Sequence, residues 1–341
     1  MGYGTPTERV LFVAKGAEYA KADGATDAFR HAVTGGHSRC TAMKVAVIGL
    51  GTMGLGAALN LHRKGHAVTG CDLREQARAE LATAGAAVVA SPAELPSDLE
   101  AVVVFVVNAA QTEAVLFGDA GCLSTLRPAT VILCCATVAP EAARALGQRV
   151  TDGGFLMLDS PVSGGRVGAH AGTMTVMASG SDAAFEKAQP VLDAISTKVW
   201  KLGGAPGIGS TVKMVNQLLA GVHIATAAEA LALGIRAGAD PHTLYDVISA
   251  SAGSSWMWQN RVPHILDADD TPLSAVNIFV KDLGIVLDQA RALTFPLPLA
   301  AAAHQLFLAA AAHGEGARDD AFVIRVWQAL TGIDLPGTPR P

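Results

Sequence analysis

The sequence predicts an α/β fold in which a doubly wound sheet domain is followed by an all-helical domain. From Met43 onward, short apolar runs alternate with helical patterns, as expected for parallel strands joined by crossover helices. A glycine-rich turn directly follows the first of these runs. A long helical stretch from Gly207 to Gly238 then introduces a C-terminal part in which we expect helices alone.

The composition is that of an apolar chain large enough for two domains. The 341 residues are 50% hydrophobic and 16% charged, and the net charge of -5 provides no basic surface for nucleic acid. Ten histidines and five cysteines show no ligand spacing, so we expect no metal. The apolar run at 297–312 is too short to span a membrane. We therefore expect a cytoplasmic protein that binds neither nucleic acid nor a membrane.

Three segments follow from these patterns. Residues 1–42 show no sustained periodicity, and we expect a poorly ordered N-terminal extension there. Residues 43–205 are predicted to form the nucleotide-binding domain. Residues 206–341 are predicted to form the helical domain, which the long interdomain helix enters.

The glycine turn has the spacing of a dinucleotide site. The first strand, KVAVIG (44–49), continues into GLGTMG, in which Gly49, Gly51 and Gly54 have GxGxxG spacing. A helical pattern follows, and then a second strand (66–72) ends in Asp72, 23 residues after Gly49. Strand, turn, helix, strand and acid in this order are typical of a Rossmann-type fold. The alternative is the glycine-rich turn of an α/β protein without a ligand.

The three glycines of the turn have different expected tasks at the cofactor. One glycine permits the tight turn, the next lets the backbone approach a pyrophosphate, and the third lets the helix pack closely, while the helix N-terminus supplies amide donors. The expected cofactor-binding residues of this turn are Gly49, Leu50, Gly51, Thr52, Met53 and Gly54.

Asp72 determines which dinucleotide is expected. Its carboxylate can accept hydrogen bonds from the adenosine ribose hydroxyls and would repel a 2′-phosphate, which favours NAD over NADP. Arg74 is a contrary signal, because a cation two residues later could meet a 2′-phosphate.

Later strands bring further candidates to the same edge of the sheet. Ligands collect at the carboxyl ends of parallel strands, so the strands predicted at 101–107 and 130–137 should place Val107, Asn108 and Thr137 beside the cofactor. A strand, a polar glycine loop and a second strand are predicted within 155–180. In that loop, the hydroxyl and amides of Ser163, Gly164 and Gly165 could converge on a substrate carboxylate, although an ordinary turn is the alternative.

A polar cluster interrupts the long helix, which otherwise has the pattern of a helix buried on nearly every side. Positions three and four residues apart share a helix face, so Lys213, Asn216 and Gln217 lie together. An unpaired ammonium in apolar surroundings is costly. Lys213 must therefore be paired, neutralised or used in chemistry.

From Met43 to about Leu330 the chain resembles the β-hydroxyacid dehydrogenases, the family of 3-hydroxyisobutyrate dehydrogenase. Four motifs carry the resemblance in the expected order: GLGTMG (49–54), DSPVSGGRVGAHAGTMTVM (159–177), GxGxxxKxxNQ (207–217) and KDLGIVLD (281–288). Within the family, the strings VVNAAQTEAVLFG (106–118), KMVNQLLAGVHIA (213–225) and FPLPLAAAAHQLF (295–307) look most like the L-threonate dehydrogenases.

The resemblance implies NAD-dependent oxidation of a small hydroxy acid, with L-threonate going to the 2-oxo acid as the first expectation. It implies Lys213 as general base, Asn216, Gln217, Asp282 and the 163–165 loop as substrate-binding, and Lys281 as cofactor-binding. Where many members have KxxNN, this chain has Gln217, and where many have DSST it has CCAT, so only Thr137 carries over. Both departures put a simple 3-hydroxy acid substrate in doubt.

Lysine can act as a base near neutral pH only if its pKa is lowered. Burial does this, and so do nearby positive charges, for which the nicotinamide ring, Lys281 and the N-terminal end of its own helix are the candidates. The structural alternative for Lys213 is an ion pair with Asp282 or Glu229.

Three alternatives of function stay open: another β-hydroxyacid dehydrogenase, reduction of a keto acid, aldehyde or imine with NADPH, and an inactive nucleotide-binding module.

A helix from Gly207 to Gly238 would span about 48 Å, too long for one small domain to cover. A homodimer or homotetramer is therefore expected.

Overall fold

A parallel sheet forms the first half of the chain. The computed structural model describes residues 42–337, so residues 1–41 of the predicted extension lie outside the described residues. The six parallel strands lie in the order β3-β2-β1-β4-β5-β6. Their bounds are Lys44–Ile48 (β1), Ala67–Cys71 (β2), Ala87–Val89 (β3), Ala101–Val104 (β4), Val131–Cys134 (β5) and Leu156–Asp159 (β6).

The sheet continues beyond β6 with mixed strand directions. β8 (Met174–Gly180) is antiparallel to β6, the short β7 (Val162–Ser163) is antiparallel to β8, and β9 (Ser196–Gly203) is parallel to β8. The strand predicted at 101–107 is shorter than expected, because the chain leaves the sheet after Val104. The predicted loop at 163–165 instead contains the end of β7 and the beginning of helix α5.

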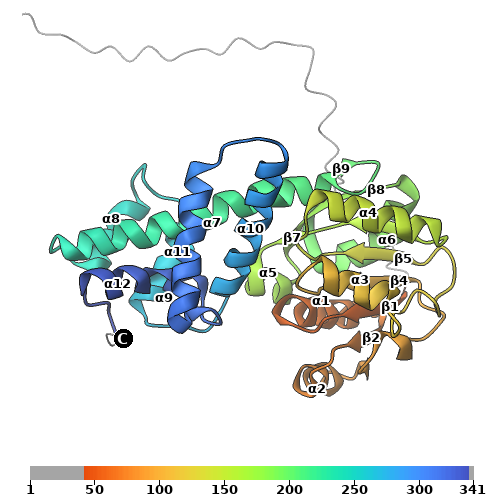
Figure 1. The fold of residues 1–341 in the computed structure, drawn as a ribbon. Helices are drawn as coiled ribbons and strands as arrows, with labels where there is room; N and C mark the ends of the chain where they lie inside the picture. The colour runs from red at the N-terminus through yellow and green to blue at the C-terminus, as the bar shows by residue number, and fades with distance from the viewer. Residues whose placement is uncertain (1–41, 338–341) are drawn as a thin grey trace, which may run out of the picture. The chain divides into compact units, whose positions relative to one another are not determined.

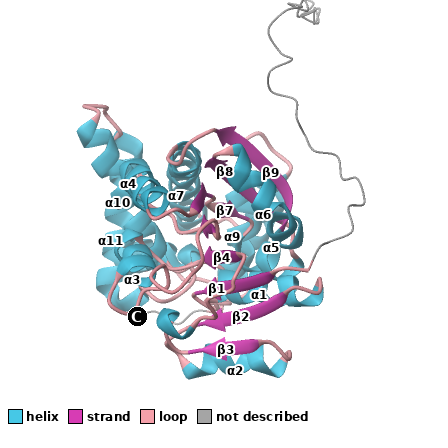
Figure 2. Ribbon diagram, turned by 90° about the vertical axis from the view of Figure 1, so that its right-hand side faces the viewer, coloured by secondary structure: helices cyan, strands magenta, loops and turns pink. Residues whose placement is uncertain are grey.

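Helices cover both faces of the sheet, as Figure 2 shows. Alternate residues of β1 point to opposite faces: Val45 and Val47 belong to the core beneath α1, α2, α5 and α6, whereas Ala46 and Ile48 belong to the core beneath α3 and α4. The predicted doubly wound fold is confirmed. These helices are Thr52–Arg63 (α1), Glu75–Thr83 (α2), Ala109–Phe117 (α3), Pro140–Asp152 (α4), Gly165–Ala171 (α5) and Asp182–Ile195 (α6).

The described C-terminal part is helical, as predicted, and is organised around α7. This helix of 29 residues runs from Ile208 to Arg236, and α10 and α11 pack across it (Figure 1). Phe279 of α10 stacks on Phe307 of α11 with the ring centroids 5.2 Å apart. The other helices are Pro241–Ser249 (α8), Trp256–Leu266 (α9), Val276–Ala292 (α10), Pro298–Ala310 (α11) and Arg325–Thr331 (α12), with a π-helical turn at Ala311–Glu315 and a 3₁₀ turn at Asp320–Ile324.

The expectation that the long helix is buried on nearly every side is wrong for the single chain. One stripe of α7 is buried, but Ile208, Val212, Val215 and Leu219 on another face are 45%, 39%, 50% and 49% exposed. They follow one another at intervals of four, three and four residues, so they share a face. By length and composition alone α7 could also cross a membrane, which is weak evidence because core helices meet the same criteria.

Candidate active site

The glycine turn between β1 and α1 leaves one side open to a ligand. Gly49 has a φ of +90°, and a Cβ there would lie 2.6 Å from the carbonyl oxygen of Phe105. A Cβ on Gly54 would lie 1.8 Å from the carbonyl oxygen of Gly49, so the missing side chain lets α1 pack closely against the glycine turn. At Gly51 the nearest atom is the Arg74 Nη2, 4.0 Å from the Cβ position. Of these three glycines of the turn, Gly51 is therefore the one at which the missing side chain leaves space for a ligand.

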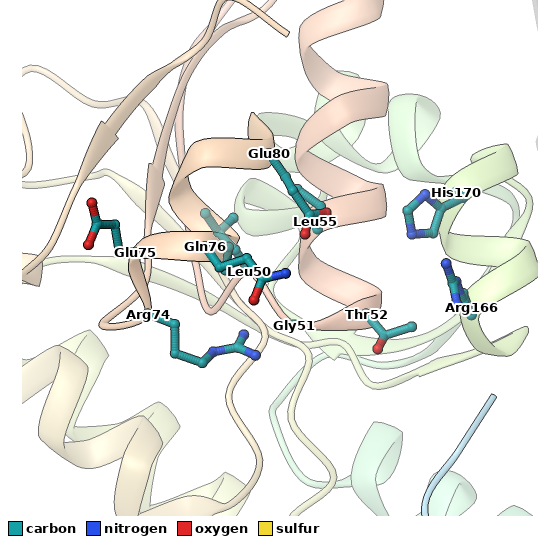
Figure 3. Close-up of a pocket in the computed structure, with 11 residues that line it drawn as sticks. Leu50, Gly51, Thr52, Leu55, Arg74, Glu75, Gln76, Glu80, Arg166 and His170 are labelled. Carbon is teal, nitrogen blue, oxygen red and sulfur yellow. The ribbon is translucent and has the colours of Figure 1, made fainter. Parts of the chain in front are cut away.

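A cavity of about 520 Å³ lies in front of this turn (Figure 3), within the range of small-molecule sites. Arg74 enters from the start of α2 on one side, and Arg166 and His170 enter from α5 on the other. The cavity, the open Gly51 and the amides at the N-terminus of α1 fit the phosphates of a dinucleotide. The lining residues are Leu50, Gly51, Thr52, Leu55, Arg74, Glu75, Gln76, Ala77, Glu80, Arg166 and His170.

Asp72 lies directly after β2, where its carboxylate accepts hydrogen bonds from two neighbouring segments. The Leu50 amide donates to its Oδ2 at 2.8 Å, and the Arg74 amide donates to its Oδ1 at 2.9 Å. The Arg74 guanidinium adds two bonds of 3.1 Å. Desolvation alone would raise the pKa of Asp72, but these bonds from Arg74 and Leu50 hold the pKa below its usual value.

A second group of predicted residues forms a connected polar cluster between α7, α10 and the end of β5. Gln217 Nε2 donates to Asp282 Oδ2 at 2.5 Å, and the Lys281 ammonium pairs with Asp282 Oδ1. Lys281 also donates to the Thr137 carbonyl oxygen at 3.2 Å, and Asn216 donates to Gln217 Oε1 at 3.0 Å. The Asp282 side chain is only 1% exposed.

Lys213 lies beside this cluster and is itself 7% exposed. Desolvation is the main cause that lowers its pKa, and the Lys281 charge adds to it, while Asp282 acts in the opposite direction; the resulting pKa is about 8. Among residues 42–337, no carboxylate lies within ion-pair distance of the Lys213 ammonium, and Glu229 is exposed. The alternative of an ion-paired structural lysine therefore lacks its partner.

The N-terminal end of α7 is not an open positive pole. The buried Asp159 carboxylate accepts hydrogen bonds there from the amides of Gly207 at 2.9 Å and Ser210 at 2.8 Å. The negative charge of Asp159 counteracts the helix dipole, so the expected contribution of the dipole to a low Lys213 pKa is not supported. Burial and Lys281 remain as the causes.

The other predicted residues lie on separate elements. Val107 is 48% exposed and its amide donates to Gln111 Oε1, while the Asn108 side chain caps α3 by accepting from the Gln111 amide. Ser163 ends β7, and Gly164 and Gly165, with φ values of +131° and +57°, lead into α5. In the described chain, the Ser163 hydroxyl makes no hydrogen bond with the Lys213 cluster.

Sequence reasoning missed several residues that the structure brings to these sites. Arg166 and His170 belonged to a segment predicted as a loop, because four glycines between 164 and 172 weaken the helical pattern of α5. Asp159 begins the DSPVSGG motif, and its sequence neighbours indicate no function for its carboxylate. No local pattern shows that it would meet a helix 48 residues later in the chain.

Comparison with known proteins places both halves of the chain. The family model described as the NAD binding domain of 6-phosphogluconate dehydrogenase matches residues 44–204. The model described as NAD-binding of NADP-dependent 3-hydroxyisobutyrate dehydrogenase matches residues 207–327.

Relatives match over nearly their whole length. The L-threonate dehydrogenase of Cupriavidus necator is 56% identical over 293 residues, which are 86% of this chain and 98% of that protein. The L-threonate dehydrogenase of Escherichia coli K12 is 50% identical over 86% of this chain and 96% of that protein. The crystal structure of 3-hydroxyisobutyrate dehydrogenase from Salmonella typhimurium is 48% identical, with a TM-score of 0.79 over 83% of this chain and 99% of that one.

These matches extend across the glycine turn, the Lys213 helix and the α10 motif, and they confirm NAD as cofactor and hydroxy-acid oxidation as the activity. The chain therefore belongs to the 3-hydroxyisobutyrate dehydrogenase-like family of β-hydroxyacid dehydrogenases, in which it is similar to the L-threonate dehydrogenases.

Proposed function

We propose that this dehydrogenase oxidises the C2 hydroxyl of L-threonate, giving the 2-oxo acid, with Lys213 as the general base. The observation that carries the proposal is the state of Lys213: it is buried, has no ion-pair partner among the described residues, and has a pKa lowered to about 8. A neutral amine in that position can accept the hydroxyl proton while the hydride leaves the carbon that bears the hydroxyl group. The L-threonate dehydrogenases at 50–56% identity support this substrate.

The cofactor-binding residues fall into two sets. NAD, when bound, would accept the hydride on its nicotinamide ring. Its phosphates would lie against the amides of the glycine turn, residues 49–54, and its adenosine ribose against Asp72. Val107, Asn108, Thr137 and Lys281 complete the proposed set, and the Lys281 bond to the Thr137 carbonyl supports a joint position for the last two.

The proposed substrate-binding residues belong to four elements, β7, α5, α7 and α10. Ser163, Gly164 and Gly165 offer a hydroxyl and amides to the substrate carboxylate, and Asn216 offers an amide to a hydroxyl. Gln217 and Asp282 are bonded to each other, and Asp282 also pairs with Lys281. Gln217 also accepts a hydrogen bond from Asn216, which is less buried, so their proposed contribution to substrate binding includes fixing the position of Asn216.

The proposed division of the chain places the boundary between β9 and α7. The sheet ends at Gly203 and α7 begins at Ile208, which supports a boundary between a nucleotide domain over 43–205 and a helical domain over 206–341. A homodimer or homotetramer in the cytoplasm completes the proposal. The exposed stripe Ile208, Val212, Val215 and Leu219 supports a partner subunit on α7, because such apolar faces are usually covered.

The test combines a substrate panel with two variants of the lysine. L-threonate, other four-carbon sugar acids and 3-hydroxyisobutyrate are each incubated with NAD while absorbance at 340 nm is followed. Lys213→Ala should lower kcat about 10²- to 10⁴-fold while the dissociation constant of NAD changes less than about twofold. Lys213→Arg should fare no better, since a guanidinium keeps its proton.

Lys201→Ala is the matched control, because Lys201 is an exposed lysine of β9 that pairs with Asp182 at the start of α6. It should leave kcat unchanged. Faster turnover of 3-hydroxyisobutyrate than of any sugar acid would replace the proposed substrate. Absence of turnover across the panel, with NAD still bound, would instead favour an inactive nucleotide-binding module.

A further inference from the structure

The Asp72 carboxylate already accepts a full set of hydrogen bonds from the chain itself. Its donors are the Leu50 amide at 2.8 Å, the Arg74 amide at 2.9 Å and two guanidinium nitrogens of Arg74 at 3.1 Å each. An ionised carboxylate offers about four lone-pair positions. The ribose hydroxyls of a dinucleotide can therefore bind Asp72 only by replacing some of these donors.

The Arg74 side chain is the donor that can leave. Its side chain is 65% exposed, whereas the Asp72 side chain is 10% exposed and the two amides are fixed by the backbone. The same guanidinium reaches towards the open Gly51, with Nη2 lying 4.0 Å from the position of a Cβ there (Figure 3). The Arg74 guanidinium thus binds the carboxylate and lies at the border of the open space beside Gly51.

A displaced Arg74 side chain remains tethered two residues from Asp72. Asp72 alone would repel a 2′-phosphate, but a guanidinium beside it offers a paired set of donors that matches phosphate geometry. The charge of Arg74 therefore opposes the discrimination that Asp72 provides. Arg74 competes with the adenosine ribose for Asp72, which weakens the binding of either cofactor. Only NADP has a 2′-phosphate that Arg74 can bind in return, so its net effect favours NADP and disfavours NAD.

We propose that Arg74 is a specificity-determining residue that lets the chain bind NADP as a second, weaker cofactor beside NAD. The inference rests on the position proposed above for the adenosine ribose at Asp72. In the unmodified chain, NADP should bind about 10- to 100-fold more weakly than NAD, since Asp72 still disfavours the added phosphate while Arg74 partly compensates it.

Calorimetric titration of the full chain and of Arg74→Ala with NAD and with NADP tests this directly, without turnover. In the variant, NADP should bind at least about tenfold more weakly, the loss expected for charge-assisted hydrogen bonds to a phosphate. NAD should bind equally well or a few-fold more tightly, because Asp72 is released to the ribose. The ratio of the NADP dissociation constant to the NAD dissociation constant should rise at least about tenfold.

Arg78→Ala provides the matched control. Arg78 donates to the backbone carbonyls of Asp72 at 2.7 Å and Leu73 at 2.9 Å, so it supports the same loop without touching the carboxylate. It should affect both cofactors alike and leave their ratio unchanged. Titration with adenosine 2′,5′-bisphosphate and 5′-AMP repeats the comparison without the nicotinamide half.

Two results would overturn the inference. Dissociation constants of both NAD and NADP that stay unchanged in Arg74→Ala would show that the side chain does not meet the 2′-position. An equal loss of both cofactors would make Arg74 a general phosphate contact. Either result leaves NAD binding and hydroxy-acid oxidation by the unmodified chain intact, whereas a failure of the proposed function appears in the substrate panel.

Discussion

Ser210 donates two hydrogen bonds to Asp159, one from its hydroxyl to Oδ1 at 2.7 Å and one from its amide to Oδ2 at 2.8 Å. Asp159 ends β6 and Ser210 lies in the first turn of α7, so this buried contact joins the sheet to the helix that carries Lys213. The Gly207 amide and the Ser179 hydroxyl also donate to the carboxylate, at 2.9 and 3.3 Å.

Asp159→Ala should therefore destabilise the protein by about 2–4 kcal/mol, because it leaves buried amides and hydroxyls without an acceptor. Chemical denaturation monitored by circular dichroism measures this change. Ser210→Ala removes one hydroxyl bond and keeps both amide bonds, so it should cost only about 1 kcal/mol. Equal, small losses in the two variants would show that Asp159 does not hold the helix.

The buried ion pair of Arg261 and Asp320 should be essential to the stability of the helical part. Arg261 is 7% exposed and Asp320 is 0% exposed, and the guanidinium donates to both carboxylate oxygens, at 2.5 and 3.2 Å. Asp320→Ala leaves the Arg261 charge buried without its partner. We expect a loss of about 3–5 kcal/mol in the free energy of unfolding.

A double variant separates the pair from its packing. Arg261→Met combined with Asp320→Leu removes both charges and keeps most of the apolar volume, so it should be more stable than Asp320→Ala alone. Thermal unfolding of the three proteins compares them. If the double variant is the less stable of the two, apolar packing around these positions matters more than charge compensation.

The fold could be predicted from the sequence where the signal is local. The apolar runs at 44–49 and 66–72 and the glycine turn between them give the first crossover, and the structure confirms it. The antiparallel placement of β8 could not be predicted, because strand direction depends on pairing between residues far apart, such as Asp159 with Ser179. The length of the long helix indicated that one domain could not cover it, but which face of α7 stays exposed could not be predicted, because an apolar stripe has the same sequence pattern whether a domain or another subunit covers it.

The site could be predicted as a list of residues but not as an arrangement. Spacing alone puts Asn216 and Gln217 near Lys213, and the structure brings Lys281 and Asp282 to them from a helix that begins 40 residues after α7 ends. The bond between Gln217 and Asp282 depends on how α10 crosses α7. No periodicity within either helix specifies that crossing.

Activity should rise with pH through the titration of Lys213. Only the neutral amine accepts the hydroxyl proton, so below the pKa the rate of hydroxy-acid oxidation should increase tenfold per pH unit, and it should level off above about pH 8. Measuring kcat/KM for L-threonate from pH 6 to 10 at saturating NAD gives the profile. A rate that falls over this range would exclude an amine base at Lys213.

The charges beside Lys213 should move this profile in opposite directions. Asp282 raises the pKa of Lys213 and Lys281 lowers it. Asp282→Asn removes the negative charge and leaves the Lys281 ammonium uncompensated, and both changes lower the Lys213 pKa. The rise in kcat/KM should therefore shift to lower pH by about one unit.

Lys281→Met should shift the same rise to higher pH by a similar amount, because it removes the like charge and leaves Asp282 facing Lys213 alone. Combining Asp282→Asn with Lys281→Met removes the pair, so the midpoint should return towards that of the unmodified protein. A merely structural role for the pair predicts lower stability and lower rates in all three variants with an unmoved midpoint. Midpoint shifts of opposite sign arise only if the charges of Asp282 and Lys281 act on the group that accepts the proton. That group would then be a neighbour of both side chains, as Lys213 is.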